Sequence, residues 1–265
     1  MGHGEEESVH RQVQEQFGAT AAAYTVSAGH GDKAALHALV ALARVKPDFV
    51  VLDIATGAGH TALAFAPHVR EVVAYDLTRA MLAETAKNAA KRGLTNVITK
   101  QGPAEKLPFK DSIFDVTVVR LASHHFADNL QAVREMARVT RSGGRVMIVD
   151  NYGPEDLALD GQLQHIEKLR DPSHVRSYRL SVWRETVRSA GLKLQREVTD
   201  RYSESPRGMS FRDWVRRSKT PPDRVAELCE IFSNASIALR ELLKIEPDGE
   251  DFWFTLPQVT LVCEC

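Results

Sequence analysis

The sequence lacks several features that would assign it to a specialised class of protein. Its 265 residues carry 34 Lys and Arg against 35 Asp and Glu, a formal net charge of -1. This balance offers no excess of positive charge for nucleic acid or an anionic membrane surface. The longest apolar runs, around 49–54 and 145–149, are far shorter than the roughly 20 residues of a membrane helix. The N-terminus, MGHGEEESVHRQ, is polar rather than signal-like. We therefore expect a cytoplasmic protein that neither inserts into a membrane nor binds nucleic acid.

Cysteine is scarce, and the spacing of the histidines does not suggest a bound metal. The three cysteines, Cys229, Cys263 and Cys265, form an odd set without a second ligand pair at zinc spacing. We expect free thiols, as is usual in a reducing compartment. The ten histidines include no H-x-x-x-H or H-E-x-x-H pattern, so no metal site is predicted.

What the sequence does contain is an alternation of short apolar runs with helical patterns. The apolar runs predict strands at residues 49–54, 71–76, 97–101, 114–120, 145–150, 192–200 and 251–264. Helical patterns such as 78–93 and 129–140 lie between them. This order predicts an α/β fold, a single domain over 1–265 built on a mostly parallel, doubly wound, Rossmann-like sheet of seven strands.

Two segments fall outside this alternation and are predicted to be helical cover segments. Residues 1–44 form a helical leader before the first strand, and residues 203–250 form an insert between the last two strands. The cofactor-binding core is expected over 45–202, and the last strand over 251–265. A minimal sheet of this kind needs only a short connection before its last strand, so both segments are candidates for a lid or cover over a site.

A glycine-rich turn, in the stretch VVLDIATGAGHTALAF, indicates a ligand site at the carboxyl end of the first strand. Residues 57–62, GAGHTA, fit the G-x-G-x-x-G/A pattern, and in an open parallel sheet the ligand lies beyond this edge. Asp53 would repel a pyrophosphate, yet it suits a ligand that carries an ammonium group and no phosphate. Asp76, at the end of the second strand, can accept hydrogen bonds from ribose hydroxyls. Asp76 serves NAD and S-adenosylmethionine equally, so both cofactors stay open at this point.

The segment after the third strand favours S-adenosylmethionine. The stretch GPAEKLPFKDSIFDVTVVR, taken with LDIATGAG, AYDLTRAML, LASHHFAD and RSGGRVMIVD, resembles the ordered motifs of class I S-adenosylmethionine-dependent methyltransferases. The likeness is to the branch of the ubiquinone/menaquinone C-methyltransferases, and residues 152–191 resemble an uncharacterised bacterial YcgJ-like group. The resemblance implies the class I methyltransferase fold and methyl transfer to a small-molecule acceptor by in-line displacement at the sulfonium methyl. An NAD(P)-dependent oxidoreductase and a non-catalytic scaffold that binds S-adenosylmethionine remain as alternatives.

The resemblance also implies which residues hold the cofactor. The aminoacyl end, the ribose and the adenine would be bound by residues from the leader and from the ends of the first four strands. These are Tyr24, Asp53, Ala55, Gly57, Gly59, Asp76, Leu77, Met81, Gly102, Ala104, Glu105, Arg120, Leu121 and Ala122. The sequence departs from the family at Ala55, where a Gly is common, and at Pro103, where an Asp is usual. Residues 14–30 resemble a leader that closes over the cofactor.

Catalytic residues are harder to predict, because methyl transfer depends mainly on holding the reactants and excluding water. A general base helps only when the acceptor carries a proton. His124 and His125 follow the fourth strand and are the candidates for that base, although either could instead cap the next helix.

Candidate acceptor-binding residues lie in two parts of the chain. Asn151 and Tyr152 follow the fifth strand, and His174 belongs to a group with His165, Arg170 and Arg176 that could equally be a solvated helix face. Phe211 and Trp214 share one face of a helix that starts at Ser210. They could form an aromatic wall beside the acceptor, or simply pack in a core. We expect a monomer or homodimer.

Overall fold

The protein is built on a seven-stranded sheet with an extra lobe beside it. A computed structural model describes residues 3–25 and 31–265, with side chains from 4 to 21 in the first range. The strand order is β3-β2-β1-β4-β5-β10-β6. The bounds are β1 (Val50–Ile54), β2 (Glu71–Asp76), β3 (Val97–Gln101), β4 (Phe114–Arg120), β5 (Thr140–Asn151), β6 (Lys193–Tyr202) and β10 (Leu256–Glu264). Strands β1 to β5 pair in parallel, whereas β10 runs antiparallel to β5 and β6. The predicted seven-stranded, mostly parallel sheet is confirmed.

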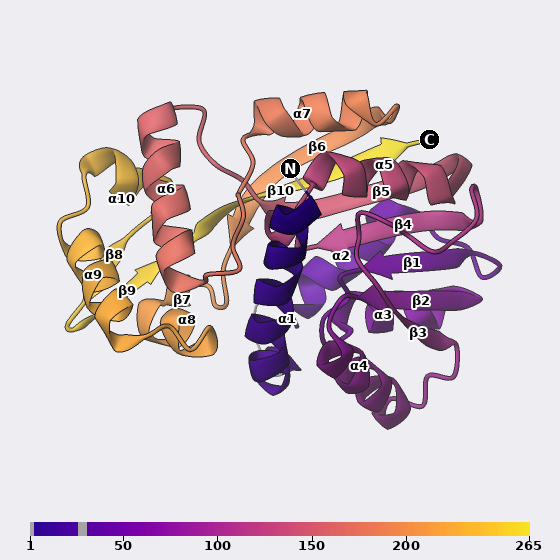
Figure 1. Ribbon diagram of the computed structural model, residues 1–265, viewed down its shortest axis with the longest axis horizontal. Coiled ribbons are helices and arrows are strands. Elements are labelled where there is room, and N and C mark those ends of the chain that lie inside the picture. Colours follow the sequence, from indigo (N-terminus) through magenta and orange to yellow (C-terminus); the bar gives the residue numbers. More distant parts are fainter. Residues whose placement is uncertain (1–2, 26–30) are drawn as a thin grey trace.

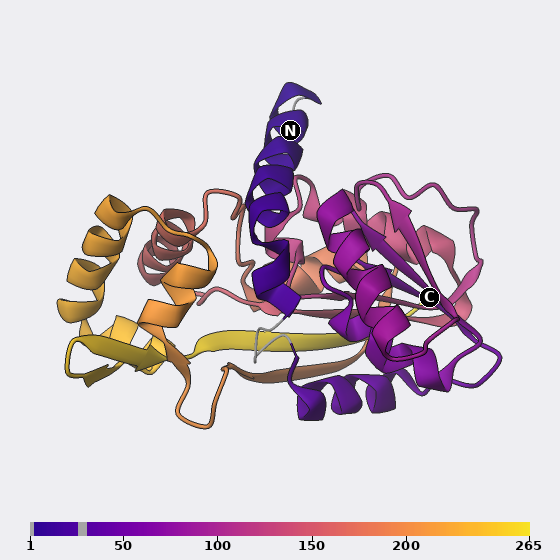
Figure 2. The same ribbon diagram turned by 90° about the horizontal axis from the view of Figure 1, so that it is seen from below.

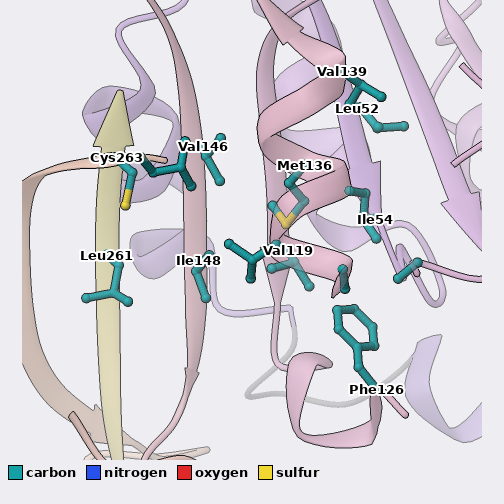
Figure 3. Close-up of a cluster of buried hydrophobic side chains, with 14 of the residues drawn as sticks. Leu52, Ile54, Val119, Phe126, Met136, Val139, Val146, Ile148, Leu261 and Cys263 are labelled. Atoms are coloured by element: carbon teal, nitrogen blue, oxygen red, sulfur yellow. The ribbon is translucent and has the colours of Figure 1, made fainter. Parts of the chain in front are cut away.

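Helices cover both faces of the sheet, which is why its central strands are mostly apolar. Leu52 and Ile54 face a core that includes α5 (Asn129–Val139) and α7 (Leu180–Ser189). Figure 3 shows this core around Met136 of α5. The alternate residue Val51 faces the other core, closed by α2 (Lys33–Ala43) and α3 (His60–Phe65). Helix α4 (Arg79–Lys91) packs on β2 and β3. Because β1 to β5 run in parallel, their carboxyl ends all lie at one edge of the sheet.

The insert forms most of a second lobe with its own apolar core. This lobe, which we call the subdomain, contains α6 (Leu157–Arg170), α8 (Phe211–Arg217), α9 (Pro222–Ser233), α10 (Ile237–Leu243) and a small sheet in the order β7-β9-β8. The small sheet consists of β7 (Met209–Ser210), β8 (Glu246–Asp248) and β9 (Asp251–Phe254). The subdomain lies at the left of Figure 1. The structure differs from the predicted boundaries in two places. Helix α6, expected in the cofactor-binding core, belongs to this lobe, and the predicted last strand is divided into β9 and β10.

The division falls at Thr255. Its N–H donates to Leu243 O at the end of α10, at 2.7 Å, so the chain leaves the small sheet there and enters the large one at Leu256. Pro257 is then the second residue of β10, near the strand start where a missing N–H is tolerated.

Helix α1 (His3–Thr25) lies between the two lobes. Figures 1 and 2 show it crossing the carboxyl edge of the sheet beside the subdomain. The amide nitrogen Nε2 of Gln16 donates to Ser218 O at 2.8 Å, and Lys219 Nζ donates to Ala19 O at 2.7 Å. On the other side, Gln14 Nε2 donates to Leu77 O at 3.2 Å. The leader is therefore tied to both lobes. In the described part of the chain, no helix is both long and apolar enough to cross a membrane.

Candidate active site

A cavity opens where β1, β2 and β4 end, beneath α1. Its empty volume, counted to the open mouth, is about 930 Å³. Most of the residues predicted to hold the cofactor line it. They are Ala55, Gly57, Asp76, Leu77, Met81, Gly102, Ala104, Glu105, Arg120, Leu121 and Ala122. The sequence motifs therefore converge on one cavity, although they are spread over some seventy residues.

The glycine-rich turn forms one wall of this cavity through left-handed backbone. Ala55, Gly57 and Gly59 have φ angles of 52°, 56° and 88°. Gly59 lies behind the wall, where a Cβ would come 2.8 Å from Thr85 Cγ2, so a side chain does not fit. Ala55 adopts a left-handed conformation that glycine takes at lower cost.

Asp53 supports the turn from behind rather than from within the cavity. It is buried and is not among the cavity-lining residues. Its Oδ2 accepts the hydroxyl of Thr56 at 2.5 Å and the N–H of Ala62 at 2.9 Å. Burial raises the pKa of Asp53 to about 7. We predicted that Asp53 lines the methionyl half of the cofactor site, but its carboxylate is occupied in fixing the turn to the start of α3.

Asp76 lies in the cavity wall with its carboxylate held in place. Its Oδ2 accepts the N–H of Gly57 at 2.9 Å, and its Oδ1 accepts the N–H of Thr78 at 2.7 Å. Burial raises the pKa of Asp76 to about 6. Each oxygen keeps a further lone pair, so this fixed carboxylate can accept hydrogen bonds from two adjacent hydroxyls.

The loop after β3 shapes the next part of the cavity through Tyr75. The Tyr75 hydroxyl donates to Pro103 O at 3.2 Å. Gly102 permits this approach, because a Cβ there would lie 2.0 Å from the Tyr75 oxygen. Sequence reasoning did not identify Tyr75, although its position directly before Asp76 was a signal. Pro103 itself lines the cavity and offers no side-chain hydrogen bond.

Helix α1 closes the cavity with three residues that sequence reasoning missed. His10, Val13 and Phe17 line it, and their spacing of three and four residues could have shown that they share one helix face. His10 Nε2 lies 3.2 Å from Glu105 Oε2, and this hydrogen bond raises the pKa of His10. The other Glu105 oxygen accepts the N–H of Ala127 at 2.8 Å. Tyr24 lies in the last turn of α1, outside the described side chains.

The two candidate bases differ in their surroundings. His124 Nδ1 lies 2.6 Å from Asp150 Oδ1, and the His124 N–H donates to Asp150 Oδ2 at 3.0 Å. Burial alone would lower the pKa of His124, but Asp150 outweighs it and the pKa is raised. His124 is not among the cavity-lining residues.

His125 is the histidine that lines the cavity. Burial and the neighbouring His124 lower its pKa to about 4, so the ring is neutral at physiological pH. Its Nδ1 lies 3.0 Å from Ser173 O, and since a carbonyl only accepts, Nδ1 carries the hydrogen. The lone pair of the ring is therefore on Nε2.

The predicted acceptor-binding residues are not brought together. Asn151 and His174 are buried, and the ring of His174 lies 5.6 Å from that of His124, between centroids. Tyr152 packs against the sheet core. Phe211 and Trp214 are 2% and 1% exposed and belong to the core of the subdomain. The aromatic wall beside the acceptor is not formed, because these two rings pack against the other aromatic residues of their own lobe.

The remaining members of the predicted cluster also separate. His165 is exposed and lies 3.3 Å from Glu227, whereas Arg176 pairs with Asp160. Residues 203–250 contribute nothing to the cavity lining. The insert therefore contacts α1 instead of covering the cavity.

Comparison with known proteins identifies the fold. Residues 52–148 match a family model described as a methyltransferase domain. The uncharacterized methyltransferase YcgJ of Bacillus subtilis is 37% identical over 225 residues, which is 84% of this chain and 87% of YcgJ. The YcgJ crystal structure covers 87% of this chain and 97% of its own, with a TM-score of 0.80 and 35% identity.

Two further proteins similar to this chain are also named as methyltransferases. The structure of a putative methyltransferase from Bacillus halodurans is 32% identical, with a TM-score of 0.81, and the match covers 87% of this chain and 98% of that one. The ubiquinone/menaquinone biosynthesis C-methyltransferase of Idiomarina loihiensis is 37% identical over 120 residues, which is 44% of this chain and 48% of that protein.

The cavity fits S-adenosylmethionine, the cofactor of this family. The fixed Asp76 carboxylate suits a ribose diol, and Leu77, Met81 and Phe126 offer apolar surface for an adenine ring. The oxidoreductase alternative finds no support among the relatives named above. The chain belongs to the class I S-adenosylmethionine-dependent methyltransferases and shares most of its length with the YcgJ-like group.

Proposed function

We propose that this methyltransferase acts on a small-molecule acceptor and that His125 is its general base for acceptors that carry a proton. One observation carries the proposal: a neutral imidazole, with its lone pair on Nε2, lines the same cavity as the cofactor residues. Because α1 lies across the cavity and narrows access to it, the site favours an acceptor of small size over a polymer, which would need an open groove.

The cofactor would be held by the residues already described. Asp76 would accept the ribose hydroxyls, Ala104 and Glu105 would flank the adenine, and the backbone at 120–122 would meet the aminoacyl end. Asp53 would contribute to cofactor binding indirectly, by fixing the glycine-rich turn that lines the cavity. When bound, S-adenosylmethionine supplies an electrophilic methyl group on a sulfonium.

The protein's own task is to exclude water and to hold a proton acceptor in place. Helix α1 closes the cavity with Val13 and Phe17, which removes water from the reacting groups. His125 Nε2 would take the proton of the acceptor, and the resulting positive charge would lie near Asp171. Ser173 connects the two, since its hydroxyl donates to Asp171 Oδ1 at 2.6 Å and lies 3.1 Å from His125 Nδ1.

His124 and Asp150 would position this base. Their short hydrogen bond fixes the His124 ring, whose centroid lies 4.2 Å from that of His125. The proximity of the two rings keeps the pKa of His125 low, as described above. We also propose a cytoplasmic location, with which the three free cysteines agree.

Two measurements test the function. Calorimetry with S-adenosylmethionine, S-adenosylhomocysteine and NAD should show binding of the first two only. Transfer of labelled methyl from S-adenosylmethionine to a metabolite extract should then yield a labelled small molecule. The His125→Ala variant should retain cofactor affinity and lose about 10²-fold or more of turnover, whereas the exposed control His68→Ala should not. Labelled protein or nucleic acid as the sole product would contradict a small-molecule acceptor.

A further inference from the structure

Three side chains that can ligate a metal ion lie together where α1 meets the loop after β3. They are Glu6 and His10 of α1 and Glu105 of that loop. Each offers one ligand atom, and the three atoms all lie within 4.8 Å of one another. Among the described residues, no other three histidine, cysteine or acidic side chains are as compact. We call these three residues the lid triad.

Helix α1 presents two of the three ligands on one face. Glu6 and His10 are four residues apart, so their side chains leave the helix one turn apart in the same direction. Both are half-buried, and His10 also lines the cavity. The spacing of histidines in the sequence could not indicate this pair, because one member is a glutamate and the third ligand lies 95 residues from His10.

Glu105 has its carboxylate fixed from behind. Its Oε1 accepts the N–H of Ala127 at 2.8 Å and that of Asp128 at 3.4 Å. These bonds leave Oε2 directed at His10, 3.2 Å from Nε2. Metal-binding carboxylates are typically oriented in this way by hydrogen bonds to the oxygen that does not face the ion. Glu105 therefore offers one preoriented ligand atom to the other two side chains.

The distances suit a small divalent ion. Zn²⁺ binds imidazole nitrogen and carboxylate oxygen at about 2.0–2.2 Å, which places neighbouring ligand atoms of a tetrahedral site about 3.3–3.5 Å apart. The 3.2 Å between His10 Nε2 and Glu105 Oε2 is close to that separation. The Glu6 carboxylate needs to approach by no more than about 1.5 Å, which rotation of its long side chain provides.

The charge of the lid triad also favours a divalent cation. The pKa of His10 is raised by its hydrogen bond to Glu105 and, further, by the negative charges of Glu105 and Glu6. Two carboxylates thus share one imidazole, whose proton balances only one of them. A divalent ion bound to a neutral imidazole and two carboxylates would balance both.

The ligand types distinguish between metals. Mg²⁺ and Ca²⁺ prefer oxygen ligands alone, whereas an imidazole nitrogen suits Zn²⁺ and the neighbouring transition metals. Three protein ligands also leave a fourth position of a tetrahedral site for water.

We propose that the lid triad binds a divalent transition-metal ion, for which Zn²⁺ is the probe, and that this ion ties α1 to the loop after β3. The ion would replace the hydrogen that lies between His10 Nε2 and Glu105 Oε2, and the ring would keep its hydrogen on Nδ1. Because His10 and Glu105 line the cavity, a bound ion would hold α1 closed over the cofactor. It would therefore slow the release of S-adenosylhomocysteine.

Zinc titration tests the site. After EDTA treatment and removal of the chelator, calorimetry at pH 7.5 should show one Zn²⁺ per chain with a Kd below about 10 μM. Mg²⁺ should bind at least about tenfold more weakly. Glu6→Gln keeps the size of the side chain but removes a charged ligand, so it should weaken Zn²⁺ binding at least about tenfold, as should His10→Ala. Glu15→Gln, on the exposed side of the same helix, is the matched control and should bind Zn²⁺ as the unaltered protein does.

Stopped-flow displacement of S-adenosylhomocysteine tests the effect on the lid. Zn²⁺ should slow its dissociation about tenfold in the unaltered protein and in Glu15→Gln, but not in Glu6→Gln. Without metal, Glu6→Gln should bind S-adenosylhomocysteine with unchanged affinity, because Glu6 does not line the cavity.

Four results would contradict the proposal. A Kd for Zn²⁺ above about 10 μM, or Zn²⁺ binding that is unchanged in Glu6→Gln and His10→Ala, would overturn the site. Equally tight binding of Mg²⁺ would overturn the imidazole ligand. A dissociation rate of S-adenosylhomocysteine that Zn²⁺ does not change would overturn the role of the ion in holding the lid. Failure of the metal-free protein to bind S-adenosylhomocysteine would instead refute the proposed function.

Discussion

The ring of Phe17 on α1 meets the imidazole of His125 edge to face, with centroids 4.9 Å apart and an interplanar angle of 84°. This contact joins the lid to the proposed base. Phe17 also lines the cavity, so the same side chain closes the cofactor site and packs against the histidine that would take the proton. The position of α1 and the position of the His125 ring are therefore coupled.

Replacing Phe17 should loosen the lid. Aromatic pairs contribute about 0.5–1.5 kcal/mol beyond the area that they bury, so Phe17→Ala should speed dissociation of S-adenosylhomocysteine by about tenfold. Stopped-flow displacement would measure this rate. Glu15→Ala, on the exposed side of the same helix, serves as the control. An unchanged dissociation rate in Phe17→Ala would show that α1 does not retain the cofactor.

Cofactor binding should weaken in acid because of Asp76. Its pKa of about 6 in the folded protein means that the carboxylate becomes protonated as pH falls below 6, and a protonated oxygen is a poorer acceptor for ribose hydroxyls. Affinity for S-adenosylhomocysteine should fall about tenfold between pH 7.5 and pH 5. Asp76→Asn should bind more weakly at pH 7.5 and show a flatter pH dependence. Equal pH dependence in both proteins would assign the effect to another group.

The raised pKa values have the opposite effect on the cofactor-free protein, whose stability should increase as the pH falls. The folded pKa values of Asp76 and Asp53, about 6 and about 7, lie above the ordinary aspartic acid value of 3.8. Between pH 3.8 and these values the folded state holds more protons than the unfolded state, so these groups make stability decrease as pH rises. Urea unfolding at several pH values should show a smaller decrease in Asp76→Asn.

Ala55→Gly should be tolerated or stabilising. A left-handed φ of 52° strains alanine by about 1–2 kcal/mol, whereas glycine loses about 0.5–1 kcal/mol more chain entropy on folding. We therefore expect the free energy of unfolding to rise by up to about 1 kcal/mol, measured by urea denaturation. Ala58→Gly, in the same turn and without a positive φ, should lower it by a similar amount. A loss at position 55 as large as that at 58 would show that the methyl group of Ala55 makes a needed contact.

The sequence predicted those elements whose burial leaves a local pattern. The runs at 71–76, 97–101 and 114–120 coincide with β2, β3 and β4. Strands β2 and β4 are covered on both faces, so they are largely apolar and end where polar site residues begin. Asp76 was found for the same reason, since it is the last residue of a buried strand. The seven-stranded sheet followed from this order.

What the sequence could not predict depends on contacts between distant segments. Phe17 reaches His125 only because α1 crosses the sheet, and nothing within α1 specifies that crossing. His174 and His165 were alike as members of a charged helical region, yet one is buried beside His124 and the other is exposed. Asp53 has the expected location, but its hydrogen bonds to Thr56 and Ala62 turn it away from the cavity.

Replacing Trp214 tests whether the subdomain contacts the acceptor or only packs in its own core. The sequence allowed an aromatic wall beside the acceptor, whereas the indole is 1% exposed, lies 5.0 Å from the ring of Phe254 and carries the Arg170 guanidinium 4.9 Å above it. Trp214→Ala should therefore cost about 3–5 kcal/mol of stability, the range for removing a buried aromatic side chain. Calorimetric unfolding would measure the loss.

The half-buried Trp253, in the same lobe, provides the matched control, and Trp253→Ala should cost far less. Binding of S-adenosylhomocysteine should be unchanged in both variants at a temperature where they are folded, because no residue of 203–250 lines the cavity. Relative rates across acceptors should also be unchanged in the folded Trp214→Ala protein. A shift in acceptor preference at undiminished stability would restore the aromatic-wall hypothesis, since it would require the indole to contact the acceptor and not only Phe254 and Arg170.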